Sequence, residues 1–191
     1  MNETLEIILV GVGLFVSVLI VTFRFRIWDY IVNDLLFKRN RKSTERSGTT
    51  WNEINDEHDA QRFMTAVGEF HDSCIKEMHY VSGAYVNQNR AMHPVNDRRA
   101  LRVVVQRQSQ DNAVIEMEFQ GVKHLNLMPA DDAYTCEILD STLRFGDNGI
   151  YWCDCGGVVD FDQYEGAMVC ATALRWRVLE HSLGEQELYR L

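Results

Sequence analysis

The four residues Phe70-His71-Asp72-Ser73 place a base, an acid and a hydroxyl group next to one another in the chain. Such groups could support hydrolysis, with His71 as the general base and Asp72 or Ser73 as its partner. Consecutive side chains diverge, however, and the members of a catalytic triad usually come from separate elements. No Gly-x-Ser-x-Gly sequence surrounds Ser73. We therefore expect these residues to hold a turn, and a hydrolase is an alternative function.

Cys153 and Cys155 are the second candidate for chemistry. Two thiols that lie two residues apart on a strand point the same way and could share a zinc ion. A structural zinc site takes four ligands, and the spacing of the other cysteines and histidines defines no second pair. We expect the two thiols to carry no metal, and a zinc-stabilised domain is a further alternative. No nucleotide-binding glycine loop is present, and the sequence predicts no cofactor.

Aromatic residues suggest a surface for another protein. Tyr and Trp are enriched at protein interfaces, which makes Tyr134, Tyr151 and Trp152 candidates for partner binding. Residues 51–191 contain twelve Lys and Arg against twenty-three Asp and Glu, a balance of −11. An acidic domain repels nucleic-acid phosphates and suits a basic partner. The composition therefore predicts a protein partner and no nucleic acid.

The N-terminal part of the chain has the composition of a membrane anchor. Residues 7–23 carry no charge, and flanking apolar residues extend this stretch to residues 5–28. That length predicts a transmembrane helix. All seven Lys and Arg of residues 1–50 follow the uncharged residues 7–23. The positive-inside rule then predicts a single-pass protein of the cell membrane, with the N-terminus outside and the C-terminal domain in the cytoplasm.

Three regions follow from these patterns: an anchor with its interface at residues 1–28, a basic juxtamembrane segment and linker at residues 29–50, and a domain at residues 51–191. In the domain, Asn55 and Gly68 bracket one expected helix. Beyond it, apolar and polar residues alternate as in strands. The segments are residues 74–81, 101–106, 115–119, 122–128, 141–154 (a hairpin around Asn148-Gly149) and 174–178. Connections too short for parallel crossovers predict an α+β fold with a mostly antiparallel sheet.

Several strings of this domain resemble a known family. They are FHDSCIKEMHYVSGAYV, LRVVVQRQ, IEMEFQGVKHLNLMP, YTCEILDSTLRF and IYWCD, in this order. They resemble a family of small uncharacterised bacterial proteins that share the Phe-His-Asp-Ser motif, over about residues 51–154. These proteins are similar in size and architecture to the immunity proteins of bacterial toxin systems, which bind and block a partner toxin. The resemblance implies a non-enzymatic, immunity-like binding domain whose partner is a toxin.

Overall fold

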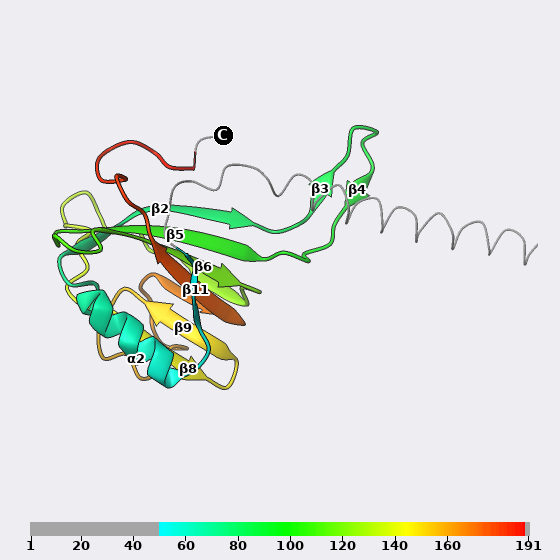
Figure 1. Cartoon of the computed structure of the whole chain (residues 1–191). Coiled ribbons are helices and arrows are strands. Elements are labelled where there is room, and N and C mark those ends of the chain that lie inside the picture. Colours follow the sequence, from blue (N-terminus) through cyan, green and yellow to red (C-terminus); the bar gives the residue numbers. More distant parts are fainter. Residues whose placement is uncertain (1–49, 190–191) are drawn as a thin grey trace, which may run out of the picture. The chain divides into compact units, whose positions relative to one another are not determined.

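The computed structural model describes residues 50–189. In these residues the chain forms one α-helix, one short 3-10 helix and eleven strands, and every strand pair is antiparallel. The protein is thus an α+β fold that consists mostly of sheet (Figure 1).

The prediction of a fold with a transmembrane helix is corrected by the structure. No helix within residues 50–189 is long and apolar enough to cross a membrane. The expected anchor at residues 5–28 and the basic stretch up to residue 49 lie outside the described residues. The expected location of the domain on the cytoplasmic side depends on that anchor and stays a prediction.

The expected helix is present as α2, Glu57–Ala66. It begins one residue later than the sequence suggested, because Asp56 is its N-cap: the Asp56 carboxylate accepts a hydrogen bond of 2.8 Å from the backbone N–H of Asp59. The helix buries Ala60, Phe63 and Met64 on one face. It is followed by the 3-10 helix η1, Gly68–Phe70, which turns the chain into the first long strand.

A five-stranded main sheet has the order β1-β11-β6-β5-β2. Its strands are β1 (Asn52–Ile54), β11 (Ala173–Val178), β6 (Val114–Gln120), β5 (Ala100–Arg107) and β2 (Ser73–Val81). A second sheet has the order β7-β10-β9-β8. It contains β7 (His124–Asn126), β10 (Met168–Ala171), β9 (Gly149–Cys153) and β8 (Thr142–Gly146), and β8 and β9 form the hairpin expected at Asn148-Gly149. A separate small hairpin pairs β3 (Tyr85–Val86) with β4 (Met92–His93).

The hydrophobic core lies between one face of the main sheet and a layer formed by α2 and the second sheet (Figure 1). Phe63, Phe70, Phe119 and Trp152 are among its largest fully buried side chains. The ring of Phe70 contacts both Phe63 and Trp152, with centroids 5.7 and 6.1 Å apart. Because burial of each large apolar side chain contributes about 1.5–3 kcal/mol, this contact anchors the end of α2 to the second sheet.

Candidate functional site

A left-handed turn follows α2 and carries the start of the Phe-His-Asp-Ser motif. Gly68, Glu69 and Phe70 have φ of 53°, 53° and 62°, and Asp72 has φ of 55°. A left-handed conformation costs a residue with a side chain roughly 1–2 kcal/mol. The turn is held by the full burial of Phe70 and by a hydrogen bond of 2.9 Å from the backbone N–H of His71 to the carbonyl of Gly68. Backbone strain of this kind is concentrated at functional sites, which directs attention to this turn.

His71 and Asp72 lie in the turn before β2, and Ser73 is the first residue of that strand. The Nδ1 atom of His71 lies 3.0 Å from Oδ1 of Asp72, and these two side chains are 64% and 50% exposed. Ser73 is buried, and its hydroxyl group donates a hydrogen bond of 3.3 Å to the backbone carbonyl of His71. The hydroxyl group is therefore bonded to the backbone, whereas a nucleophile would be bonded to the imidazole.

A shallow groove runs beside α2 and meets this turn. It consists of two adjoining cavities of about 420 and 410 Å³, which share Glu69 and Asp140 as lining residues. Glu57 lines the first cavity, and His71 and Leu139 line the second. We call this feature the α2 groove. The expected motif residue His71 thus opens onto a concave surface, together with acidic residues that are distant in sequence.

The α2 groove is acidic. Its lining residues include the carboxylates of Glu57, Glu69 and Asp140 and no lysine or arginine. Two of the carboxylates are oriented by the backbone: Glu57 accepts a hydrogen bond of 2.9 Å from the N–H of Phe145, and Asp140 accepts one of 2.8 Å from the N–H of Ser141. Fixed carboxylates in a concave surface concentrate negative potential, so the groove favours a positively charged ligand.

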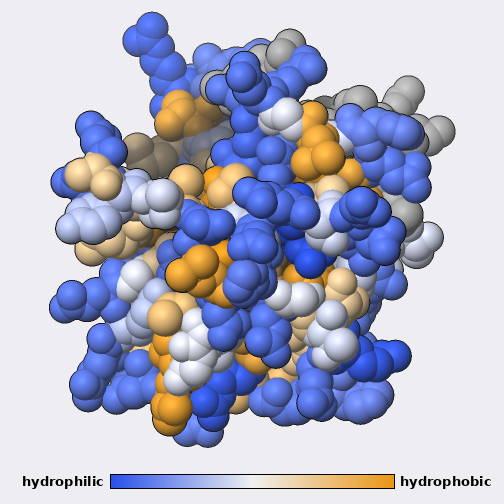
Figure 2. Space-filling model, turned by 90° about the vertical axis from the view of Figure 1, so that its left-hand side faces the viewer, coloured by the Kyte–Doolittle hydropathy of each residue, from blue (hydrophilic) through white to orange (hydrophobic). Residues whose placement is uncertain are grey.

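Exposed apolar residues are spread over the surface of the domain. On the side that Figure 2 shows, the surface is mostly hydrophilic, and the hydrophobic residues form small patches that polar residues separate. Single exposed apolar residues are common on soluble domains, whereas a contiguous apolar patch would indicate an interface. Recognition on this side of the domain therefore depends on polar and charged groups.

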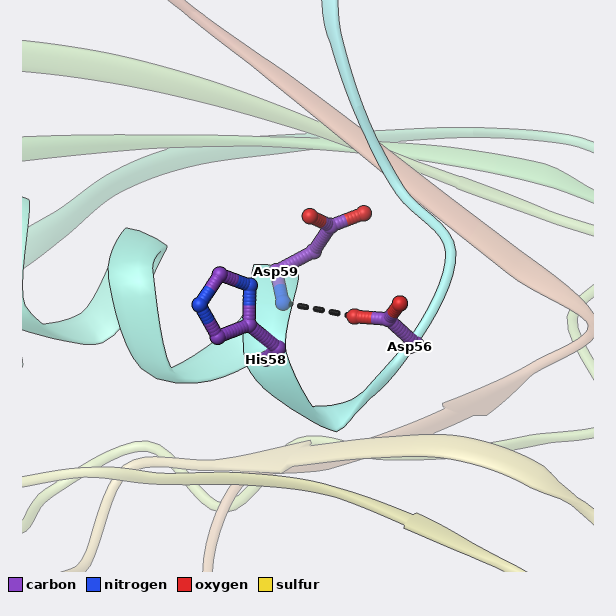
Figure 3. A group of neighbouring side chains, drawn as sticks. All are labelled: Asp56, His58 and Asp59. Carbon is purple, nitrogen blue, oxygen red and sulfur yellow. Dashed lines mark hydrogen bonds between the residues drawn. The ribbon is translucent and has the colours of Figure 1, made fainter.

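Asp56, His58 and Asp59 are the one group of three potential metal ligands among the described residues, with ligand atoms within 4.8 Å of one another. Figure 3 shows how they begin the helix: Asp56 caps the backbone N–H of Asp59. The Asp59 carboxylate in turn contacts Arg62 at 2.5 Å and accepts the backbone N–H of Asn55 at 3.1 Å. The hydrogen bond from Arg62 lowers the pKa of Asp59. These acids serve the helix start and its ion pair.

The two candidate zinc ligands lie in different surroundings. Cys153 is buried at the end of β9, and Cys155 is exposed beyond the end of that strand. The thiol of Cys153 donates a hydrogen bond of 3.3 Å to the carbonyl of Cys155. Burial raises the pKa of the Cys153 thiol. The zinc alternative gains no support from this geometry.

The three aromatic candidates for partner binding differ in how exposed their rings are. Trp152 is fully buried, and its ring packs against Phe70 and Phe119, which leaves it no surface for a partner. The ring of Tyr151 stacks on Phe161 at 4.7 Å. Tyr134 is 76% exposed. Of the three, Tyr134 is the residue whose ring is most available for contact with another protein.

The main sheet carries charged residues on the face opposite the core. Arg102, Glu118 and Arg175 are direct cross-strand neighbours, and Glu116 pairs in the same way with Arg177. Glu118 binds Arg102 at 2.7 Å and Arg175 at 2.6 Å, and Glu116 binds Arg177 at 2.6 Å. We call these five residues the charged ladder. Sequence reasoning missed it, although alternate residues of 115–119 are acidic and alternate residues of 174–178 are basic.

Burial and charge act against each other on Glu118. Burial raises the pKa of its carboxyl group, but hydrogen bonds from Gln120 and Arg102 and the charges of Arg102 and Arg175 lower it by more. The net effect holds the pKa of Glu118 below its ordinary value. Over the ladder, the indole ring of Trp51 covers the guanidinium groups of Arg175 and Arg177 at 4.5 and 4.4 Å. The ladder is thus an ionised, partly covered network.

No protein-family model, curated protein or solved structure matches the chain. The resemblance to small bacterial proteins with a Phe-His-Asp-Ser motif therefore stays a prediction from the sequence.

Proposed function

We propose that this domain is a non-enzymatic protein-binding module whose α2 groove receives a basic segment of a partner protein. The observation that carries the proposal is the convergence of Glu57, Glu69 and Asp140 on one concave surface whose lining, among residues 50–189, contains no lysine or arginine. Unpaired carboxylates in a groove favour cationic side chains and speed the encounter with a positively charged protein.

The strained turn supports the same proposal. Glu69 contributes its carboxylate from a left-handed conformation that a glycine would adopt at no cost. The presence of a costly residue at that position is consistent with a role for its side chain beyond the fold. The immunity-like resemblance supports a toxin as the partner, because immunity proteins act by binding and blocking a toxin without chemistry of their own.

The test compares two triple variants of the full chain that have the same net charge. Glu57→Gln with Glu69→Gln and Asp140→Asn neutralises the groove. Asp131→Asn with Asp132→Asn and Glu165→Gln neutralises three exposed acids elsewhere, which are the matched control. Binding of a fluorescein-labelled oligolysine peptide is measured by anisotropy, with oligoglutamate as the negative probe.

The groove variant should bind oligolysine about tenfold more weakly than the wild type, and the control should bind nearly as well as the wild type. Both variants should melt close to the wild-type temperature, because the altered side chains lie at the surface. Equal losses in the two variants would attribute the binding to net charge and would refute a groove-specific site.

The close pair of His71 and Asp72 at the edge of a cavity favours a hydrolase as the second candidate. An activated ester such as p-nitrophenyl acetate discriminates between the two functions. Hydrolysis above the buffer rate that is lost in His71→Ala and retained in His58→Ala would support the enzyme. Identical rates in all three chains would support the binding module.

A further inference from the structure

The C-terminal segment, residues 180–189, lies across the polar face of the main sheet, on the side away from α2 (Figure 1). After Leu179, whose backbone N–H binds the carbonyl of Val114, the segment leaves the strand ladder. From there it is held by side chains that project from β2, β5 and β6. The segment is therefore held on the sheet face by side chains, whereas the strands of the sheet are held to one another by backbone pairing.

Three side chains of the sheet bind the backbone of the segment. Glu77 accepts hydrogen bonds from two successive N–H groups, those of Leu188 at 2.6 Å and Tyr189 at 3.3 Å. The Gln106 amide donates bonds of 3.1 Å to two carbonyls, those of Ser182 and Gly184. The ammonium group of Lys76 donates a bond of 2.7 Å to the carbonyl of Glu185. These contacts require only an extended or turning backbone and do not depend on the side chains of the segment.

Two side chains of the segment supply anchors. The hydroxyl group of Tyr189 donates a hydrogen bond of 2.5 Å to the buried carboxylate of Glu116, and its ring meets His79 edge-on at a centroid distance of 5.3 Å. Leu188 packs against a small apolar cluster that contains Val104 and Val114. A specific peptide site combines hydrogen bonds to the peptide backbone with contacts to anchoring side chains, which here are Leu188 and Tyr189.

We infer that the polar face of the main sheet is a binding site for a peptide segment that presents a Leu-Tyr pair, that the chain's own C-terminal segment occupies it, and that a partner segment of the same chemistry can take its place. The site does not depend on the α2 groove, which lies on the other side of the main sheet. A partner would gain the same contacts with Glu77, Gln106 and Glu116 that the segment makes within the chain.

Replacement is possible because the segment is tethered at one end and held by side chains. Contacts of this kind open locally at lower free energy than the central strands of a sheet. The tether gives the segment an effective concentration in the millimolar range, so a free peptide competes poorly until the internal anchor is weakened. Removal of Tyr189 weakens that anchor and leaves the receiving residues in place.

The experiment measures binding of a fluorescein-labelled peptide with the sequence Glu180–Leu191 to the full chain. The peptide should bind the Tyr189→Ala chain at least about tenfold more tightly than the wild type, whose site is occupied. The combination Tyr189→Ala with Glu77→Ala should abolish the gain, because the two N–H groups lose their acceptor. Tyr189→Ala with Asp140→Asn, which alters the α2 groove alone, should retain the gain. A peptide in which Phe replaces Tyr189 should bind the Tyr189→Ala chain more weakly than the unaltered peptide.

Equal binding to the wild type and the Tyr189→Ala chain, or no binding to a Tyr189→Ala chain that is folded by circular dichroism, would overturn the inference. Hydrogen exchange of the wild-type chain supplies a measurement that needs no variant. The amides of Leu188 and Tyr189 should exchange faster than those of Trp176 and Arg177 in β11. If all four exchange at the same slow rate, the segment opens only when the whole domain unfolds, and no partner can replace it.

Discussion

Glu116 is the most deeply buried charged residue of the described domain, at 2% exposure, and its carboxylate is bound by Arg177 and Tyr189. Transfer of ions from water into a protein is costly, so the pair with Arg177 contributes less to stability than its short distance suggests. The loss of one partner is different, because the remaining charge stays buried without compensation. Single residues of the charged ladder should therefore be sensitive to substitution in proportion to their burial.

Arg177→Ala should lower the free energy of unfolding by about 3–5 kcal/mol, the usual cost of a buried pair that loses one member. For a domain of this size the melting temperature should fall by roughly 9–15 °C. The control is Arg62→Ala, which removes the exposed partner of Asp59 and should leave the melting temperature nearly unchanged. Thermal unfolding by circular dichroism measures both. A similar small effect of the two substitutions would contradict the account of a buried ladder.

Glu118 should make the stability of the domain depend on pH in the acid range. Its pKa in the folded state lies below the ordinary value of 4.5, so it contributes stability that is fully present above about pH 4.5. That contribution is lost as the pH falls below 4.5 and through the lowered folded pKa, where both states bind the proton. The difference in unfolding free energy between the wild type and Glu118→Gln should therefore be largest near neutral pH and shrink in acid. A difference that is constant from neutral pH to about pH 3 would show that Glu118 is not held ionised.

At the scale of elements, the left-handed turn after α2 holds Glu69 in a conformation that costs stability, while the carboxylate of Glu69 lines the proposed binding groove. Glu69→Gly should raise the free energy of unfolding by on the order of 1 kcal/mol, because glycine adopts the φ of 53° without a penalty. The melting temperature should rise by about 3 °C. Glu69→Ala keeps the penalty and is the matched control, since it removes the same carboxylate. Both variants should bind oligolysine equally weakly, and an unchanged melting temperature in Glu69→Gly would indicate that the turn stores no strain.

The elements differ in how well their sequences predict them. Residues 101–106 and 115–119 alternate clearly, because one face of each strand meets the core, and these strands are confirmed with small changes of boundary. β10 was missed because its sequence, Met-Val-Cys-Ala, contains no charged or strongly polar residue, so no alternation marks the strand. The strand predicted at residues 122–128 is shortened to β7. Pro129, which follows residue 128, cannot donate a backbone hydrogen bond.

The candidate site was predictable only in part, because its residues come from segments that are distant in sequence. The motif at His71 marks one edge of the α2 groove, and its position could be read from local sequence. Asp140 and Glu57 meet at the groove because α2 packs against β8, a tertiary contact that no local pattern encodes. The C-terminal segment has no periodicity, because its contacts depend on side chains of β2 and β5 that are distant in sequence.

At the scale of the whole molecule, the carboxylates of the charged ladder and those of the α2 groove lie in different surroundings. Those of the ladder are neutralised by arginines on neighbouring strands, whereas those of the groove face solvent without a basic partner in the groove lining. The excess of twenty-three acidic over twelve basic residues in 51–191 gives the domain a negative field, to which the groove carboxylates contribute locally. The proposed binding module should use charge to attract its partner and the groove to orient it.

The association rate of a basic probe should consequently fall as salt is added. Between about 0.01 and 0.15 M ionic strength the Debye length shrinks from about 30 to 8 Å, which removes long-range attraction and leaves contacts inside the groove less affected. Stopped-flow measurements with labelled oligolysine should show a steep fall of the association rate for the wild type and for the matched control triple. The groove triple has the same net charge as that control, so its association rate should fall with a similar slope while its dissociation rate is higher at every salt concentration. If the groove triple instead differs from the control only in its association rate, the groove carboxylates contribute field and no contact, and a defined binding site for a basic segment would be excluded.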